Sequence, residues 1–479
     1  MKQYIFNTAI AILLLVTGSA SVAAQNIRTA YFMDNATHRH HLNPAYQTPT
    51  GYVSVPMLGS VQANFNTNTL NVKNIFSPYQ GELVTFLHSS VDGSQFLNKM
   101  RDINHINMDM NLSVLSTGFY TKVGYFTFDI GAKVYGGGVI PKEFLKFAKM
   151  GMTDENGQTY HFKNLDIDAS AYTDIAFGYS RKLDDRLTVG GKFKILLGFA
   201  DTKIHYSDVV ATLNEDKWTM TTTGTADVVA TGVSPKYSDD AFDKIDGIDY
   251  SSGFGVNGIG AGIDMGATFK SVDLFDGKVG EIFDNFTFSA ALLDLGFISW
   301  NSKNAVKGVA DGETFEFSGL DLDFFDDDSD IPSMGDQLSD VGDELKEIFY
   351  FSEQTPSSRA RMLRATLNLG AEYSFFEDKL GVGLLSSTRF GAPHTWSELT
   401  LSGNYQPFDW LGVTLSYSFI HSSFQTFGWA LNLSPSWINF FIGADYMVTK
   451  VAKPFVPMTN AMNVNFGISV PLSKNKASN

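Results

Sequence analysis

The sequence predicts an all-β protein, a single transmembrane antiparallel β-barrel of about 14 strands with an N-terminal hatch and helical extracellular loops. Three observations predict this fold. Apolar residues recur at every second position over long stretches, turn residues separate these stretches, and an export signal stands at the start of the chain. The 40 Phe, 19 Tyr and 43 Gly also suit strands better than helices.

Two-residue alternation is clearest in the last third of the chain. Between 461 and 472 the apolar positions are Met462, Val464, Phe466, Ile468, Val470 and Leu472, and small or polar residues stand between them. The stretch from Arg364 to Phe375 repeats the pattern. Because successive side chains of a strand point to opposite faces, each such stretch has one apolar and one polar face. Serial alternating stretches of about ten residues are typical of transmembrane β-barrels.

Further strands follow from the same alternation, and an even number of them is expected for a single-chain bacterial barrel. Trp218–Ala230 is rich in Thr and is expected to extend beyond the membrane. The expected barrel strands are Tyr52–Phe65, Met108–Val114, Phe119–Tyr135, Ala171–Tyr179, Leu187–Phe199, Gly253–Lys270, Phe286–Trp300, Arg364–Phe376, Leu380–Phe390, Trp396–Gln406, Leu411–Ile420, Phe427–Leu433, Trp437–Tyr446 and Ala461–Leu472.

The first 24 residues read as a secretory signal peptide. Lys2 supplies the basic start, Ala9 to Val16 form a short apolar core, and small residues precede the expected cleavage after Ala24. No later stretch reaches the ~18 apolar residues of a transmembrane helix. Export together with alternating strands indicates a bacterial outer membrane; a secreted soluble β-protein is the alternative. The expected division is signal peptide 1–24, hatch 25–50, barrel 51–472 and polar tail 473–479.

Composition excludes several classes of function. The chain has no Cys, which removes disulfides, thiolate metal sites and a lipoprotein anchor. Its net charge of -16 disfavours binding to nucleic acid, because phosphate contacts need Lys and Arg. No hydrolase, zinc-protease or phosphate-loop motif occurs, so no enzyme, catalytic residue or cofactor is expected. His421 with two neighbouring serines is the nearest approach to a catalytic group.

Charged residues on the polar faces of the strands predict a polar lumen. A Lys or Arg that faced lipid at mid-membrane would cost about 2–4 kcal/mol, so these side chains are expected to point inward. The expected lumen-facing residues are Asp129, Lys133, Lys192, Lys194, Asp264, Arg364 and Glu372. Gly258–Gly262 lacks dinucleotide spacing and is expected to let a plug approach the wall or to permit a kink.

Several connections are too long to be tight turns. Helical spacing is expected within Glu82–Met100 and Pro141–Met150, where a loop helix could cap the barrel mouth or pack on other loops. The acidic stretch 321–347 begins with carboxylates at EF-hand spacing, but Ile331 and Gln337 replace the required Gly and Glu. Whether this loop binds calcium through a looser site stays open.

Residues 25–50 show little periodicity and are expected to form a plug. Asn43, Pro44 and Ala45 stand just before the first strand. This segment resembles the hatch of FadL-like outer-membrane channels for hydrophobic compounds, whose superfamily includes the PorV-like barrels of type IX secretion. The chain resembles this superfamily over most of its length, and an uncharacterised family within it is expected. The nearby His38, His40 and His41 could bind zinc or copper, but a polar hatch-lining loop explains them equally, and no metal is expected.

Two functions follow from this resemblance. The first is binding or passing small hydrophobic molecules across the outer membrane. The alternative is a non-transporting barrel that docks subunits of a surface or type IX secretion complex. Expected partners are outer-membrane lipid and lipopolysaccharide, a hydrophobic ligand, and secretion subunits. A general porin is disfavoured because an N-terminal plug would close the lumen.

Overall fold

The computed structural model describes residues 27–152, 157–215, 217–237, 244–251, 253–272, 277, 283–317, 337, 351–391, 394–420, 424–447, 451–452, 456–457 and 461–472. The expected signal peptide, most of the acidic stretch 321–347, the group at His421 and the tail 473–479 lie outside these residues. Among the described residues, no helix has both the length and the apolar character needed to cross a membrane.

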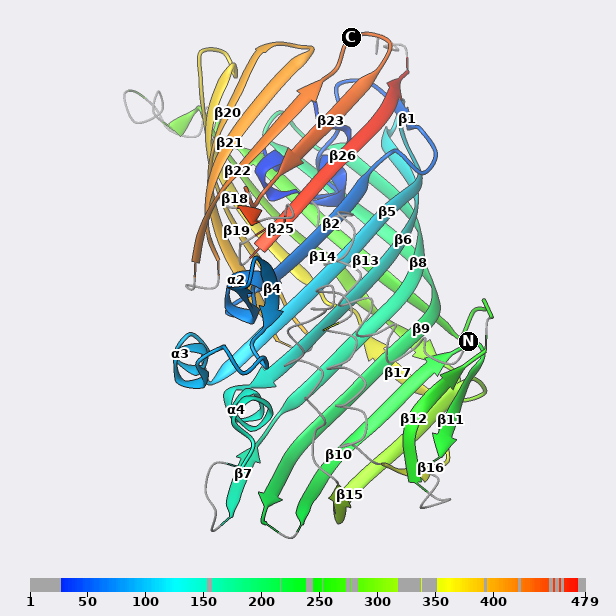
Figure 1. Ribbon diagram of the computed structural model, residues 1–479. Coiled ribbons are helices and arrows are strands. Elements are labelled where there is room, and N and C mark those ends of the chain that lie inside the picture. Colours follow the sequence, from blue (N-terminus) through cyan, green and yellow to red (C-terminus); the bar gives the residue numbers. More distant parts are fainter. Residues whose placement is uncertain are drawn as a thin grey trace.

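The described residues form a closed wall of 14 antiparallel strands, if β1 with β2 and β17 with β18 each count as one (Figure 1). The wall closes where β26 pairs with both β1 and β2. In wall order its strands are β1 (Tyr52–Ser54) with β2 (Val61–Thr67), β5 (Ile103–Thr121), β6 (Gly124–Pro141), β8 (Leu165–Lys182), β9 (Leu187–Leu213), β13 (Gly258–Lys270), β14 (Phe286–Trp300), β17 (Arg359–Met362) with β18 (Thr366–Phe375), β19 (Leu380–Arg389), β20 (Trp396–Phe408), β21 (Leu411–Ile420), β22 (Phe424–Leu433), β23 (Asn439–Ala444) and β26 (Ala461–Pro471).

The predicted barrel and its strand number are confirmed. The expected strand from Phe119 is divided differently, because Thr121 pairs with Gly124 across a tight turn and Phe119 belongs to β5. Inward residues such as Lys192, Lys194 and Asp264 are buried. Their outward neighbours are large exposed apolar side chains, among them Phe177, Phe193, Ile263, Phe297, Leu384, Leu401 and Leu415. Apolar groups at this density on an outer surface need lipid around them.

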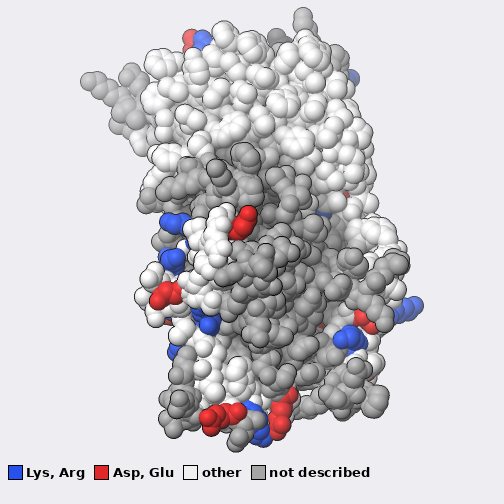
Figure 2. All heavy atoms as spheres, viewed as in Figure 1, with Lys and Arg blue, Asp and Glu red and all other residues white. Residues whose placement is uncertain are grey.

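Short turns gather at one end of the barrel and long connections at the other. On the face shown in Figure 2, the described surface toward the short-turn end is almost free of charged atoms, and charged residues gather toward the long-loop end. Bacterial barrels place short turns in the periplasm and long loops outside the cell. The same orientation is therefore expected for this barrel.

At the long-loop end the same sheet continues beyond the barrel, and this extension is called here the outer sheet. β9 continues beyond its pairing with β13 and there pairs with β7 (Gln158–Phe162) and β10 (Trp218–Ala230). β15 (Ala305–Phe317), β16 (Phe351–Gln354), β12 (Lys244–Tyr250) and β11 (Val233–Tyr237) extend this sheet. The expectation that Trp218–Ala230 lies beyond the barrel agrees with this pairing.

An apolar core holds the outer sheet against α4 (Lys142–Met150), the helix expected from Pro141 onward. Phe144 and Phe147 pack there against Tyr160 and Phe162. The neighbouring connection contains α2 (Val72–Ile75), the hairpin β3 (Phe76–Tyr79) with β4 (Glu82–Thr85), and α3 (Gly93–Asn98). The helix expected within Glu82–Met100 is thus shorter, because its first residues pair as β4. β24 (Val451–Ala452) and β25 (Val456–Pro457) form a further short hairpin.

Candidate functional site

Residues 27–50, called here the luminal segment, lie inside the barrel toward its short-turn end (Figure 1, blue). The segment contains two 3-10 turns, η1 (Arg28–Ala30) and η2 (Thr37–His41). Asp445 of the wall caps η1, accepting hydrogen bonds from the backbone N–H groups of Arg28 at 3.1 Å and Thr29 at 2.7 Å. The Arg28 guanidinium lies 2.5 Å from the buried Glu398 carboxylate. A charged cluster thus fixes the beginning of the segment to the wall.

Asn43, Pro44 and Ala45 join the end of the segment to the opposite wall. The Asn43 side-chain N–H group donates to the carbonyls of Ala267 in β13 at 3.2 Å and Ala290 in β14 at 3.3 Å. Its oxygen accepts the Ala45 N–H at 2.9 Å, which closes a local turn. Asn43 is fully buried. A side chain that forms all three bonds fixes the distance between the segment and these two strands.

Glycines let the luminal segment approach the wall closely. A Cβ atom built at Gly266 would lie 2.0 Å from the Asn43 side-chain oxygen, and one at Gly190 would lie 2.2 Å from the Pro44 carbonyl oxygen. Five further wall glycines would meet the segment in the same way: Gly370, Gly383, Gly412, Gly428 and Gly467. Gly258 and Gly260 instead face Trp300 and Phe297 of the neighbouring strand. The plug is therefore accommodated by glycines other than those between 258 and 262.

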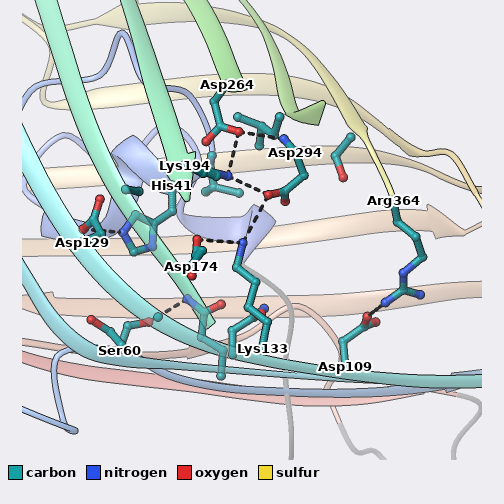
Figure 3. A pocket seen from close by; sticks show the side chains of 18 of the residues that line it. His41, Ser60, Asp109, Asp129, Lys133, Asp174, Lys194, Asp264, Asp294 and Arg364 are labelled. Carbon is teal, nitrogen blue, oxygen red and sulfur yellow. Dashed lines mark hydrogen bonds and ion pairs between the residues drawn. The ribbon is translucent and has the colours of Figure 1, made fainter. Parts of the chain in front are cut away.

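A charged cavity of about 140 Å³ lies inside the barrel beside the luminal segment (Figure 3). This volume exceeds the roughly 30 Å³ share of one water molecule, so several fit. The cavity is lined by six basic side chains (Arg28, Lys133, Lys192, Lys194, Arg364 and Arg389), by five Asp side chains (Asp109, Asp129, Asp174, Asp264 and Asp294) and by His41. Water or a polar solute can supply hydrogen bonds to these charged side chains in place of bulk water, whereas a wholly apolar molecule cannot.

Lys192 and Asp129 form the part of the cavity nearest η2. The Lys192 ammonium donates to Asp129 Oδ2 at 2.9 Å and to His40 Nδ1 at 2.6 Å. Since an ammonium only donates, Nδ1 accepts, and the proton of the neutral imidazole is on Nε2, which faces the Tyr52 hydroxyl. Tyr52 bonds Ser116, whose hydroxyl donates to Asp129 at 2.6 Å.

The surroundings of His40 also decide whether the histidines suit zinc or copper, the alternative raised by the sequence. His40, His41 and Asp129 bring three ligand atoms within 4.8 Å of one another. The Lys192 ammonium contacts two of these ligand residues. A fixed cation already neutralises Asp129 and occupies His40 Nδ1, so this donor set suits Lys192 better than a divalent ion.

Two lysines and three carboxylates meet deeper in the cavity (Figure 3). Lys194 lies 2.7 Å from both Asp264 and Asp294. Lys133 lies 3.3 Å from both Asp174 and Asp294. Asp294 therefore bridges the two ammonium groups.

A β-bulge turns Asp294 into the lumen. The pairing of β13 with β14 shifts between Ile263 and Met265, leaving one extra residue on β14. Asp294 takes a φ of 55°, and its N–H donates to Asp264 Oδ1 at 2.7 Å. Left-handed backbone is unfavourable for a residue other than Gly, and Asp and Asn tolerate it better than most. Bulges of this kind re-aim a side chain.

Across the cavity, Asp109 of β5 pairs with two arginines. Arg389 donates two hydrogen bonds to its carboxylate at 2.9 Å, and Arg364 forms a further ion pair with it. The Arg364 guanidinium also lies 3.8 Å from the centre of the Tyr135 ring. Toward the long loops, Arg359 and Arg361 pair with Asp201 at 2.6 and 2.7 Å. Ion pairs thus continue from the luminal segment toward the outer sheet.

The family match covers most of this architecture. Residues 44–445 match the model described as "Family of unknown function (DUF5723)". The chain belongs to the DUF5723 family. The expectation of an uncharacterised family is confirmed. No curated protein matches the sequence.

Solved structures similar to this DUF5723 chain include a Pseudomonas aeruginosa FadL homologue, at 10% identity with a TM-score of 0.37 over 98% of both chains. The Ralstonia pickettii toluene transporter TbuX follows at 9% identity and 0.35 over 95% of both chains. The P. putida toluene transporter TodX has 10% identity and 0.32 over 95% of both chains. At these scores the likenesses carry no functional argument. The family named in the first of these descriptions is the one that the N-terminal motif resembles.

The cavity of this DUF5723 member brings together six of the seven residues expected in the lumen, namely Asp129, Lys133, Lys192, Lys194, Asp264 and Arg364. Glu372 lies apart, in a smaller cavity of about 20 Å³ that Asp34 also lines, where it accepts a hydrogen bond from Asn404 at 2.9 Å. Sequence reasoning missed Asp109, Asp174, Asp294 and Arg389. Asp109 and Asp174 stand in alternating stretches and could have been found by extending the lumen-facing set to every polar position there.

Proposed function

We propose that the protein is an outer-membrane channel protein that passes small molecules and is closed at rest by its luminal segment. The observation that carries this proposal is the plug itself: residues 27–50 bond to strands on opposite sides of the lumen, and a charged cavity remains beside them. A barrel that served only as a scaffold would not need such a cavity.

The outer apolar surface supports the membrane location. Outward side chains of β9, β13 and β20 are apolar, while inward residues of the same strands are charged or polar. Closed barrels satisfy all strand hydrogen bonds internally, which a lipid environment requires. The expected export signal at 1–24 agrees with an outer-membrane protein.

The solute class follows from the resemblance and from the cavity together. The resemblance of the N-terminal segment to FadL-like channels favours a small hydrophobic molecule as the solute. A purely apolar molecule in this cavity would displace water from ionised groups without replacing its hydrogen bonds. We therefore propose a small hydrophobic molecule that also carries an ionised or strongly polar group. The alternative docking role has no contact among the described residues that favours it.

A disulfide lock tests the channel proposal, and the chain has no native Cys to interfere. A Cβ built at Gly428 lies 2.5 Å from Thr29 Oγ1, so cysteines at these two positions can reach bonding distance. In liposomes that contain the Thr29→Cys/Gly428→Cys variant, we expect faster benzoate entry under reducing than under oxidising conditions.

Gly428→Cys alone is the matched control, because it adds the same wall side chain without a partner thiol, and it should not respond to the oxidant. Entry of toluene, a wholly apolar probe, and of sucrose, a polar probe, is measured in the same liposomes. Equal benzoate entry in the locked, unlocked and protein-free liposomes would contradict the proposal. Entry of sucrose as fast as benzoate would contradict the proposed solute class.

A further inference from the structure

The cavity has an excess of negative charge at the level of Asp294. Three carboxylates meet two ammonium groups there, and these belong to Asp174, Asp264, Asp294, Lys133 and Lys194 (Figure 3). Among the described residues, no further basic side chain lies within ion-pair distance of these three carboxylates. One negative charge at this level is therefore not neutralised by the described part of the chain.

Two carboxylate oxygens at this level can accept further hydrogen bonds. Both lysines bond Asp294 through Oδ1, and its Oδ2 accepts no hydrogen bond among the described residues. Asp174 is 6% exposed and lines the cavity, and its Oδ1 also has no hydrogen-bond partner in the described part of the chain. A buried carboxylate oxygen without a donor is unfavourable. A ligand with an ammonium group would supply the missing donors.

Arginines give the opposite balance at the level of Asp109. Arg364 and Arg389 both pair with its carboxylate, which is the only described carboxylate within ion-pair distance of either guanidinium. The bonds to Asp109 use Nη2 of Arg364 and Nη1 of Arg389. Because a guanidinium has five N–H donors, both side chains keep donors for a second carboxylate. One positive charge is in excess at this level.

The register of the wall gives the distance between the two levels. Asp109 pairs with Tyr135 of β6, and Asp174 pairs with Gly131 of the same strand. Four residues of strand correspond to about 13 Å. Tyr172 of β8 lines the cavity between these levels. A ligand that reaches both levels must therefore carry its charges several bonds apart, with an uncharged chain beside Tyr172.

We propose that the cavity binds a zwitterion whose opposite charges stand several bonds apart, as in an ω-amino acid or a dipeptide. Its carboxylate accepts hydrogen bonds from Arg364 and Arg389, and its ammonium group donates to Asp174 and Asp294. Such a ligand neutralises both excess charges at once, whereas a simple anion or cation neutralises only one. This inference rests on the proposed function, because it specifies the solute of the same cavity.

Isothermal titration calorimetry of the full chain, in micelles of an uncharged detergent, tests this inference. The probes δ-aminovalerate, valerate and pentylamine share the same carbon chain and differ in their charged ends. Valine, an isomer of δ-aminovalerate, has both charges on one carbon. We expect δ-aminovalerate to bind about tenfold tighter than each of the other three, because each of them loses a charged contact.

Two variants each remove one end of the site. Arg389→Gln should weaken the binding of δ-aminovalerate and valerate but not that of pentylamine. Asp174→Asn should weaken the binding of δ-aminovalerate and pentylamine but not that of valerate. Glu372→Gln is the matched control, since it removes a luminal carboxylate outside this cavity and should change no affinity. Heat-dependent gel mobility checks that each variant is folded.

Absence of δ-aminovalerate binding, or an affinity equal to that of any other probe, would overturn the inference, and this comparison needs no variant. An unchanged affinity for δ-aminovalerate in the folded Asp174→Asn variant would also overturn it. Binding in micelles does not require passage through the barrel. A failure here would therefore leave the channel proposal intact, and a failure of the disulfide-lock experiment alone would leave the binding site intact.

Discussion

At the residue scale, Asp294 joins backbone conformation to charge at the centre of the lumen. Its φ of 55° is needed for the bulge, and its carboxylate then reaches Lys133 at 3.3 Å and Lys194 at 2.7 Å. The strained backbone costs of order 1–3 kcal/mol unless neighbouring contacts support it. The Asp264 carboxylate provides that support by accepting the Asp294 N–H.

Asp294→Asn separates these contributions, because Asn tolerates left-handed backbone but has no charge. Lys133 and Lys194 each keep one other carboxylate, Asp174 and Asp264. We therefore expect a loss of about 1–3 kcal/mol in the free energy of unfolding. Urea titration of the folded barrel in vesicles measures it. Asp185→Asn, on an exposed turn, should change stability little, and an equal loss in both variants would contradict this account.

Simple alternation predicted some of these residues and could not predict others. Lys192 and Lys194 follow the regular pattern of β9 and were expected in the lumen. Counting by twos from the outward Phe288 places Asp294 outside, and only the extra residue at the bulge turns it inward. Bulges depend on pairing between strands, which a single sequence does not display.

At the scale of elements, the luminal segment is held by hydrogen bonds that join distant parts of the chain. Thr29 bonds Ser416 at 2.7 Å, and Asn35 accepts from Asn432 and Asn439 at 3.2 and 3.1 Å. The segment itself has only short 3-10 turns, so wall contacts supply most of its order. Its closeness to the wall depends on glycine in the facing strands.

Gly266→Leu should displace the segment. The new Cβ would lie 2.0 Å from the Asn43 oxygen and 2.8 Å from Pro44, which is closer than packed atoms allow. We expect low conductance for the wild type in planar bilayers and a clear increase for this variant. Gly403→Leu is the control, because a Cβ there meets no atom within 4 Å. A folded Gly266→Leu barrel that stayed closed would contradict the role given to the glycine.

The sequence predicted a separate segment before the first strand, but not the contacts of that segment with the wall. Weak periodicity before the first strand and the Asn43–Ala45 motif indicated a segment of its own. Which glycines face it depends on the register of strands far away in the sequence, so the glycine-rich stretch 258–262 was a misleading guide.

At the scale of the whole molecule, two-residue alternation decides which surface faces lipid. Phe193 of β9 is 51% exposed and points outward, between the inward Lys192 and Lys194. Nearly all barrel strands were predicted from this pattern, because lipid outside and charge inside impose it on every strand. The outer sheet was predicted only in part, since both of its faces lack lipid.

Phe193→Lys should therefore destabilise the barrel by about 2–4 kcal/mol in bilayers, since a lipid-facing ammonium at mid-membrane loses its hydration. Urea-dependent unfolding in vesicles, followed by tryptophan fluorescence, measures the change. Phe254→Lys is the control, because Phe254 is 84% exposed and precedes β13. A cost at Phe254 as large as at Phe193 would contradict the assigned membrane depth.

β9 gives the barrel a mechanical property that its shorter strands lack. Its 27 residues run from the short turn after β8 through the wall into the outer sheet, and it pairs with β7, β8, β10 and β13. A force applied to the outer sheet reaches the wall beside Lys192 along one hydrogen-bonded ribbon, without crossing a loop. Tension on the outer sheet would therefore act as shear between β9 and β13, next to Lys192 and Lys194.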